Sequence, residues 1–292
     1  MATLHNNVVP ASGGPAVFLG DRGLFMGGTL AFPITTIEYV SISSTGNATS
    51  FGSLARGGAD GSAASNGARV VHTDGNAKNM EYITVATTGN ATSFGTQRET
   101  YQNGSCSDGV RGVFGGEYSM EYITIASTGN STNFGWLSVT RRMNSGAGGV
   151  TRGVFTGGQG NVIDYITIQT TADAVDFGNL TTARTYPASF SDGFRVVNAG
   201  GTNSVSAMQQ SMDYITLMTT GNASNFGNLS TPRTYMAECA SSIRGLVSGG
   251  RPSWSNPQVN IIEYVTIAST GNTTDFGDLI AVAGLASGAS GD

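Results

Sequence analysis

The stretch MEYITIASTGNSTNFG, residues 120–135, recurs six times along the chain in closely similar form. The copies begin at Ile37, Met80, Met120, Ile163, Met212 and Ile262, and their tyrosines are Tyr39, Tyr82, Tyr122, Tyr165, Tyr214 and Tyr264. Consecutive tyrosines lie 43, 40, 43, 49 and 50 residues apart. A recurrence of this length is typical of repeat architectures, in which each repeat is one supersecondary unit.

Each copy predicts two strands joined by a turn. The segment EYITIAS, residues 121–127, is rich in Tyr, Ile and Thr, which suit a half-buried pleated surface. The following TGN predicts a tight hairpin, because Gly and Asn tolerate positive φ. Upstream runs such as RGVFGGE, residues 111–117, and small-residue segments such as GSCSDGV, residues 104–110, predict two further strands. Six repeats of four antiparallel strands predict an all-β, six-bladed β-propeller, which protects its strand edges by radial repetition.

Closure of the ring is predicted from the spacing of the innermost strands. Their equivalent positions, five residues before the second-strand Arg, are Ala64, Cys106, Ala147, Phe190 and Cys239. Each of them lies nine or ten residues beyond the residue that ends Phe-Gly-x-x, and counting ten on from Leu279 reaches Ala289. We therefore expect the C-terminal GLASGASGD to supply the inner strand of blade one. Residues 22–292 then form the propeller and residues 1–21 an N-terminal arm, of which Ala16–Gly20 competes for the same inner position.

The repeat resembles known sequence families. The order Gly-Gly, strand Tyr, strand aromatic, Leu and Arg resembles the kelch repeat, with Phe where kelch usually has Trp. The phrase YITIASTGN-x-T-x-FG-x-L, together with RGVFGG, is similar to kelch-like repeats of virion proteins in tailed phages, particularly marine ones. The resemblance covers residues 22–292. It implies a propeller fold and a structural role in a virion, although Thr171-Ala172-Asp173 replaces TGN and Thr73-Asp74 replaces Gly-Gly.

Composition and charge exclude several classes of protein. Charged residues make up only 11% of the chain, its pI is near 5.0, and Lys78 is its single lysine. Nucleic-acid binding requires clustered Lys and Arg, so no nucleic-acid partner is expected. No apolar run reaches the length of a membrane span, and no membrane insertion is expected. The N-terminal residues lack the pattern of a signal peptide, which favours synthesis in a cytoplasm.

Most of the charged residues follow the repeat. One arginine position holds Arg22, Arg69, Arg111, Arg152, Arg195 and Arg244, and another holds Arg56, Arg98, Arg141, Arg184 and Arg233. The acids beside the tyrosines are Glu38, Glu81, Glu121, Asp164, Asp213 and Glu263. A charge used once in every blade is typical of a scaffold, whereas an active site uses it once. We interpret these residues as hydrogen-bonding and ion-pairing groups between strands or blades.

The sequence contains few residues that could form a catalytic site. Only His5 and His72 are present, and no phosphate-binding loop, Cys-x-x-Cys pair or metal-ligand spacing appears. Cys106 and Cys239 occupy the same repeat position half a ring apart, which is too far for a disulfide. We therefore predict two reduced, buried thiols and a non-enzymatic protein without metal or cofactor.

A binding surface is predicted where the repeats differ. The connections between the second and third strands are long only at residues 29–36, 202–211 and 251–261, in blades one, five and six, which closure makes neighbours. Exposed aromatic and Arg side chains are common interface anchors. The predicted arc contains Phe32, Met208, Gln209, Gln210, Arg251, Trp254 and Gln258, with Tyr186 and Tyr235 nearby. The alternative is that Trp254 merely packs its own loop.

The leading functional hypothesis is a non-enzymatic structural or adhesion protein of a phage virion. It is expected in the tail, a fibre or another appendage, after assembly in the host cytoplasm. Other virion proteins are the expected partners, and a host surface glycan is a candidate partner of the arc. Two alternatives remain: a soluble glycan-binding lectin, and a kelch-type adaptor with a basic, Arg-lined channel mouth that binds peptides.

Overall fold

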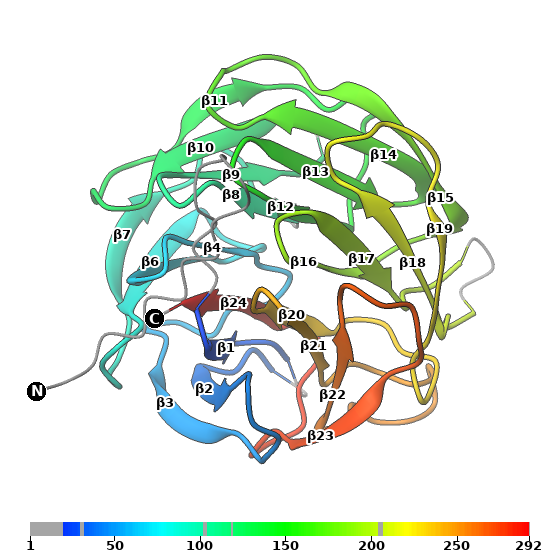
Figure 1. Ribbon diagram of the computed structural model, residues 1–292. Coiled ribbons are helices and arrows are strands. Elements are labelled where there is room, and N and C mark those ends of the chain that lie inside the picture. Colours follow the sequence, from blue (N-terminus) through cyan, green and yellow to red (C-terminus); the bar gives the residue numbers. More distant parts are fainter. Residues whose placement is uncertain (1–19, 30–31, 102–103, 118, 204–206, 292) are drawn as a thin grey trace, which may run out of the picture.

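The computed structural model describes residues 20–29, 32–101, 104–117, 119–203 and 207–291. Six four-stranded antiparallel sheets are arranged as blades around a central channel (Figure 1). The predicted all-β, six-bladed propeller with four strands per blade is confirmed.

In blades one to three the strands are, from the channel outward, as follows. Blade one contains β24 (Ser287–Gly291), β1 (Arg22–Met26), β2 (Thr36–Ser41) and β3 (Thr49–Ser53). Blade two contains β4 (Ala63–Ser65), β5 (Arg69–Thr73), β6 (Asn79–Thr84) and β7 (Thr92–Thr96). Blade three contains β8 (Gly104–Ser107), β9 (Arg111–Gly115), β10 (Met120–Thr124) and β11 (Thr132–Gly135).

Blades four to six follow the same order. Blade four contains β12 (Asn144–Gly148), β13 (Arg152–Gly157), β14 (Gly160–Thr167) and β15 (Val175–Arg184). Blade five contains β16 (Ala188–Ser191), β17 (Arg195–Ala199), β18 (Ser211–Thr216) and β19 (Ser224–Asn228). Blade six contains β20 (Ala237–Ala240), β21 (Arg244–Ser248), β22 (Ile261–Thr266) and β23 (Thr274–Asp278).

The ring is closed by the C-terminal strand. β24 pairs with β1 and places Ala289 opposite Leu24, just as Cys106 lies opposite Val113 in blade three. The predicted C-terminal closure is therefore observed, in the predicted register. Residues 1–19 of the predicted arm lie outside the described residues. Asp21 joins blade one, because its carboxylate accepts a hydrogen bond from the backbone N–H of Ser43 at 2.7 Å.

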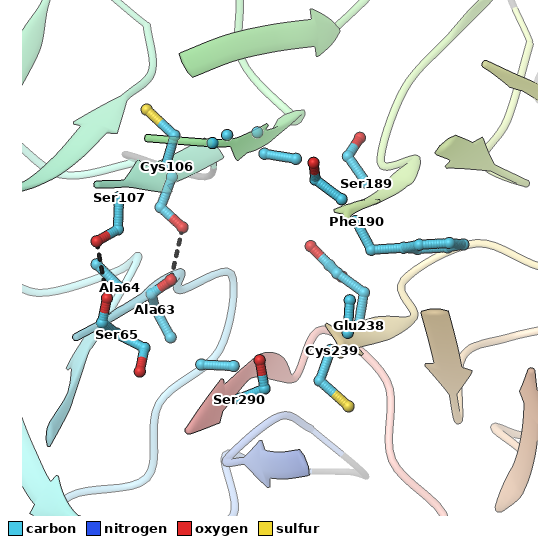
Figure 2. A pocket seen from close by; sticks show the side chains of 18 of the residues that line it. Ala63, Ala64, Ser65, Cys106, Ser107, Ser189, Phe190, Glu238, Cys239 and Ser290 are labelled. Carbon is cyan, nitrogen blue, oxygen red and sulfur yellow. Dashed lines mark hydrogen bonds between the residues drawn. The ribbon is translucent and has the colours of Figure 1, made fainter. Parts of the chain in front are cut away.

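The inner strands surround a channel lined mainly by small residues (Figure 2). Cys106 of β8 and Cys239 of β20 point their thiols away from its centre. Both cysteines are free and buried, as the sequence predicts. Burial raises the pKa of both thiols well above the usual range, so both remain protonated.

The outer strands repeat one aromatic stack in every blade. The Phe of each Phe-Gly pair lies at a β-bulge and meets the blade's Tyr edge-to-face, with ring centroids 5.9–6.2 Å apart. The second-strand Arg lies over the same Tyr at 4.2–4.9 Å. Its guanidinium also donates to a carbonyl of the next blade. Arg244 closes this circuit by donating to the Ile42 carbonyl at 3.0 Å.

The TGN turn differs from its prediction. Its asparagines do not have positive φ. Instead each Asn side chain accepts the backbone N–H of the preceding blade's outermost strand or of a residue next to it, as Asn222 does from Asn179 at 3.0 Å. In the divergent repeat Asp173 does the same for Trp136, also at 3.0 Å. The Asn is therefore needed for a hydrogen bond between blades and not for a positive φ in the turn.

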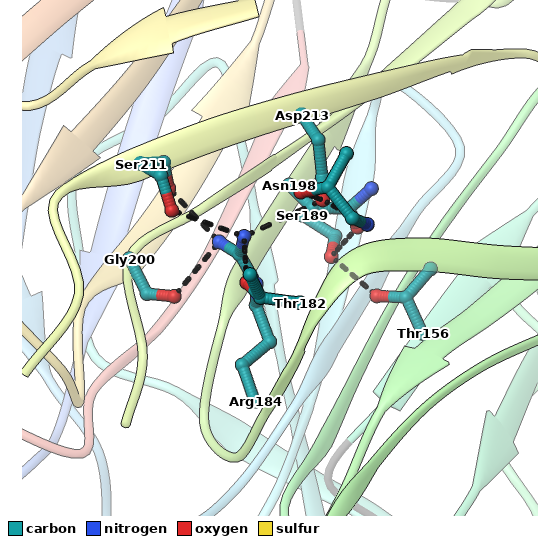
Figure 3. A network of polar contacts seen from close by, with 9 residues as sticks. Thr156, Thr182, Arg184, Ser189, Asn198, Gly200, Ser211 and Asp213 are labelled. Atoms are coloured by element: carbon teal, nitrogen blue, oxygen red, sulfur yellow. Dashed lines mark hydrogen bonds and ion pairs between the residues drawn. The ribbon is translucent and has the colours of Figure 1, made fainter. Parts of the chain in front are cut away.

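The repeated acids join neighbouring blades. All six are buried, and each accepts a backbone N–H from the preceding blade's last strand or from the connection that follows it. In blades four to six the acid also pairs with an arginine: Arg141–Asp164 at 3.0 Å, Arg184–Asp213 at 3.4 Å, and Arg233–Glu263. Figure 3 shows Arg184 donating to the carbonyls of Gly200 and Ser211 as well.

The prediction that the second arginine set holds one position is wrong for two members. Arg56 and Arg98 are exposed, whereas Arg141, Arg184 and Arg233 are buried. The buried three lie four residues after a Leu, and this length lets the guanidinium turn back beneath the connection. In blade one Ala283 holds the equivalent place, and burial raises the pKa of the unpaired Glu38.

Candidate functional site

The channel opens at both ends, and one end faces the long connections. There a small chamber is enclosed by the starts of the inner strands and the bends that lead into them. We call it the mouth chamber. Its lining includes Asp60, Ser105, Asn144, Ser145, Tyr186, Tyr235, Glu238 and Ser287. The chamber itself is narrow, and a volume of about 500 Å³ is reached only when the open solvent at its mouth is included.

A ring of strained residues surrounds the mouth chamber. Each bend holds one non-glycine residue with φ between 50° and 63°: Asp60, Tyr101, Met143, Tyr186, Tyr235 and Leu285. Such residues are uncommon, and their strain is held where the surrounding structure over-determines it. Here backbone bonds between bends provide that restraint. Leu285 donates its N–H to the Tyr235 carbonyl at 2.9 Å, and Asp60 donates to the Leu285 carbonyl at 3.2 Å.

An aromatic row leads outward from the mouth. Tyr186 and Tyr235 meet at 4.5 Å between ring centroids, and Tyr235 meets Trp254 at 6.1 Å, both edge-to-face. Trp254 remains 47% exposed. The Tyr186 hydroxyl hydrogen-bonds to the Asp60 carboxylate, and burial raises the pKa of both groups, to a degree that keeps the phenol protonated. The predicted Trp254, Tyr235 and Tyr186 are thus neighbours at one face.

Arg251 organises the blade-six loop. Its guanidinium donates to the Ser253 carbonyl at 3.0 Å and to the Trp254 carbonyl at 2.7 Å. It also lies 5.8 Å from the Trp254 ring. Arg251 was predicted as a contact residue. In the structure it also has a structural role, because it holds the loop that carries Trp254.

The blade-six loop also brings Gln258 to the mouth. A Cβ at Gly284 would lie 3.0 Å from Gln258 Cγ and 3.7 Å from Tyr235 Cβ, so the two side chains border the same glycine. Thr29 of the blade-one loop bonds to Gly284 at 2.7 Å. The long connections of blades six and one are therefore adjacent, as ring closure implies.

The blade-five residues lie farther along the same face. Met208 forms a bridge with Thr202, and Gln209 donates its backbone N–H to the Gly201 carbonyl at 2.8 Å. The Gln210 carbonyl accepts the N–H of Leu229 at 2.8 Å. Their backbone is thus tied to the blade, and Gln210 is exposed. Phe32 of blade one is 80% exposed and lies apart from the aromatic row.

Sequence reasoning missed the polar groups inside the chamber. Glu238 of β20 points toward the channel centre (Figure 2) and accepts a hydrogen bond from Ser145 Oγ at 3.2 Å. Glu238 is partly buried in the channel wall, and desolvation of its carboxyl raises the pKa of Glu238 to about 8. The other blades have Ala63, Ser105, Gly146, Ser189 and Gly288 at this position. A single acid among small residues was a visible departure from the repeat.

The described residues also bear on metal binding, on the state of the histidine and on membrane insertion. Within them no group of three or more His, Cys, Asp and Glu side chains is placed to hold a metal ion. His72 is buried with Nδ1 2.8 Å from Ser287 Oγ, and burial lowers its pKa to about 4, so it is neutral at pH 7. Across the described ranges, no helix has the length and apolar character to cross a membrane.

Comparison with models of protein families and with curated proteins finds no match to this chain. What is established is therefore the architecture: a six-bladed β-propeller with four-stranded antiparallel blades, whose aromatic row and polar mouth chamber lie on the long-loop face.

Proposed function

We propose that this chain is a non-enzymatic structural or adhesion protein of a phage virion, located in the tail, a fibre or another appendage. The observation that carries the proposal is the separation of roles in the molecule. The repeated Arg, Tyr, Phe and acidic side chains bond blade to blade, while unrepeated aromatic side chains gather at one face. Such a division suits a rigid disc that displays one binding face.

The amino-acid sequence of the repeat supports the virion assignment, since YITIASTGN with Phe-Gly resembles repeats of tailed-phage virion proteins. The bonding of the blades supports a structural role. Each blade is tied to the next by an Arg–carbonyl bond, a bond from a backbone N–H to the turn Asn (Asp173 in blade four), and an acid–amide bond. In this proposal the N-terminal arm docks to other virion proteins, and the long-loop face points toward the host surface.

The arrangement of titratable groups supports a non-enzymatic role. Most charged side chains are engaged in the scaffold, and no histidine lines the mouth chamber among the described residues. Glu238 has a perturbed pKa, which often marks a catalytic acid. Its hydrogen-bond partners, however, are the Ser145 hydroxyl and the Ser189 backbone, and neither is a base that would activate a nucleophile.

The virion assignment is tested by mass spectrometry of purified virions from the phage that carries this coding sequence. We expect peptides of this chain in stoichiometric amounts after density-gradient purification. Abundant protein in the infected-cell lysate with none in the virions contradicts the proposal.

The display face is tested with Trp254→Ala, using Trp136→Phe as the matched control at a second exposed tryptophan. Trp254 is half exposed, so the loss of unfolding free energy should be below about 1 kcal/mol. Attachment of the purified propeller to host cells should fall at least tenfold, while Trp136→Phe attaches normally. A large loss of stability with unchanged attachment means that Trp254 only packs its loop.

A second candidate function is a soluble glycan-binding lectin, which the aromatic row beside buried amide and carboxyl groups favours. Glycan binding by the isolated protein, without virion association, would select it. The kelch-type peptide adaptor is not favoured. It requires an Arg-lined mouth. The described residues that line the mouth chamber and the rest of the channel include Asp60, Asp108 and Glu238 but no Arg or Lys.

A further inference from the structure

We infer that the mouth chamber is a binding site for a neutral polyhydroxylated group, such as the terminal sugar of a glycan. This inference rests on the adhesion function proposed above, because it names the ligand class of that face. It places the polar part of recognition inside the channel mouth, on Asn144 and Glu238, which do not belong to the predicted arc.

A buried side chain without a hydrogen-bond partner is the first argument. Asn144, at the start of β12, is 3% exposed, and neither its Oδ1 nor its Nδ2 has a partner. Buried polar atoms are nearly always bonded, and each exception calls for an explanation. Asn144 lines the mouth chamber, where a ligand hydroxyl can both donate to the amide oxygen and accept from the amide nitrogen.

The second argument is the carboxyl group of Glu238, which lies at the floor of the same chamber. Its Oε1 accepts from Ser145 Oγ, and the carboxyl group also accepts a hydrogen bond from the backbone of Ser189, while the side chain points toward a channel of small residues. With a pKa near 8 the group is mostly protonated at pH 7, so it can donate a hydrogen bond as well as accept one. Amide and protonated carboxyl together offer donors and acceptors without a net charge.

The rim supplies the apolar part of the site. Tyr186 and Tyr235 line the chamber, and Trp254 continues their row outward. Aromatic rings with polar groups beside them suit a sugar, whose C–H face packs on a ring while its hydroxyls reach polar partners. Backbone hydrogen bonds between the bends hold both tyrosines, from the Tyr186 N–H to the Met143 carbonyl at 2.7 Å and from the Leu285 N–H to the Tyr235 carbonyl at 2.9 Å, which keeps the rim in place before a ligand arrives.

Charge selects against ionic ligands. No Arg or Lys lines the chamber among the described residues, so an anion would find no counter-charge. A cation would find the Asp60 carboxylate, but Tyr186 already hydrogen-bonds to it, and the nearby Arg142 is paired with Glu117. The chamber therefore fits a neutral group better than a charged one.

The test uses Trp254 as the reporter. The chain has two tryptophans, so Trp136→Phe leaves Trp254 as the single one. In this background the full-length protein is titrated at pH 7 with free galactose, glucose, mannose and N-acetylglucosamine, and with methylammonium chloride, while Trp254 fluorescence is followed. We expect at least one sugar to shift the emission with a millimolar dissociation constant, and methylammonium to have no effect.

Variants locate the site. Asn144→Ala and, independently, Glu238→Ala should each weaken binding of that sugar at least tenfold. Asn228→Ala, on the outer strand β19, is the matched control and should leave it unchanged. Because buried variants can lose stability, binding is compared only between proteins with native circular dichroism. Asp60→Asn serves as a rim variant outside the chamber floor and should also weaken binding.

The outcomes separate this inference from the virion assignment. If no sugar shifts Trp254, if methylammonium alone does so, or if Asn144→Ala and Glu238→Ala bind normally, the chamber is not the site and the inference is wrong. That result leaves the presence of the chain in virions untouched. Sugar binding by a chain absent from virions supports the chamber and selects the lectin function.

Discussion

In the outer strands of the propeller the same Arg, Tyr and Phe recur in every blade, whereas the six bends around the channel mouth hold four kinds of residue. Both regions are sixfold in backbone geometry. They differ in what the side chains contact: in the outer strands each side chain meets the same partner in every blade, whereas at the mouth the side chains border the chamber and only some of them meet, as Tyr186 meets Tyr235 and Asp60. A repeated position must fit a repeated neighbour, so it cannot vary without breaking the ring. A position facing open space is released from that constraint and can be used for recognition.

The largest expected effect breaks a repeated position that is buried. Arg233→Ala leaves the Glu263 carboxylate buried without its partner and should lower the free energy of unfolding by about 3–5 kcal/mol. Arg98→Ala, at the exposed counterpart, should cost below about 0.5 kcal/mol. Urea denaturation of both variants measures the contrast. Similar losses would mean that burial does not distinguish the two arginines.

The next effect concerns the unrepeated acid of the channel. The Glu238 pKa is raised from its ordinary 4.5 to about 8, so the folded protein holds a proton that the unfolded chain has lost. The free energy of unfolding should therefore fall as pH rises from about 4.5 to about 8, and the substitution Glu238→Gln should remove this dependence on pH. The variant should match the wild type at pH 5 and exceed it by about 3–5 kcal/mol at pH 9. Parallel stability curves from pH 5 to 9 contradict this.

A smaller effect tests the close approach of neighbouring blades. A Cβ at Gly227, in the Phe-Gly pair of blade five, would lie 2.0 Å from the Gly271 carbonyl oxygen in the turn of blade six. Gly227→Ala should cost about 1–3 kcal/mol, because one of two backbones must move. At Gly271 a Cβ meets open space, so Gly271→Ala is the matched control and should cost below about 0.5 kcal/mol. Thermal unfolding of both variants is the measurement.

The smallest effect sharpens the revised role of the TGN asparagine. Asn222→Ala removes the acceptor of the Asn179 N–H and should cost about 0.5–1.5 kcal/mol. Asn222→Asp should be nearly neutral, since Asp173 makes the same bond in blade four. If the aspartate variant is as unstable as the alanine variant, the side-chain acceptor is not what the turn requires.

Much of the fold was predictable because a repeat reports its own geometry. The strand positions, the closure at Ala289 and the separate buried thiols all follow from counting equivalent residues. The sequence analysis did not predict that Arg98 is exposed while Arg233 is buried. The difference follows the spacing from a preceding Leu, which lies four residues before Arg233, and an alignment of the repeats alone does not show its importance. The TGN turn was misread, since Asn suits both positive φ and side-chain bonding, and only the neighbouring blade shows which is used.

The candidate site was predicted in part. The long connections identified Trp254 and Gln258, and closure made blades five, six and one neighbours. Asn144 and Glu238 were missed, because each belongs to an inner strand whose pattern predicts only a wall of the channel.

The sequence by itself determined the number of blades, their strand order and the scaffold positions, since these depend on local patterns repeated at a regular distance. Only the tertiary structure decided which unrepeated residues meet. Asp60, Asn144 and Glu238 belong to three different blades, and they share one chamber because the ring closes around it. Proximity across a closed ring depends on the angle of each blade, which no local pattern of residues encodes.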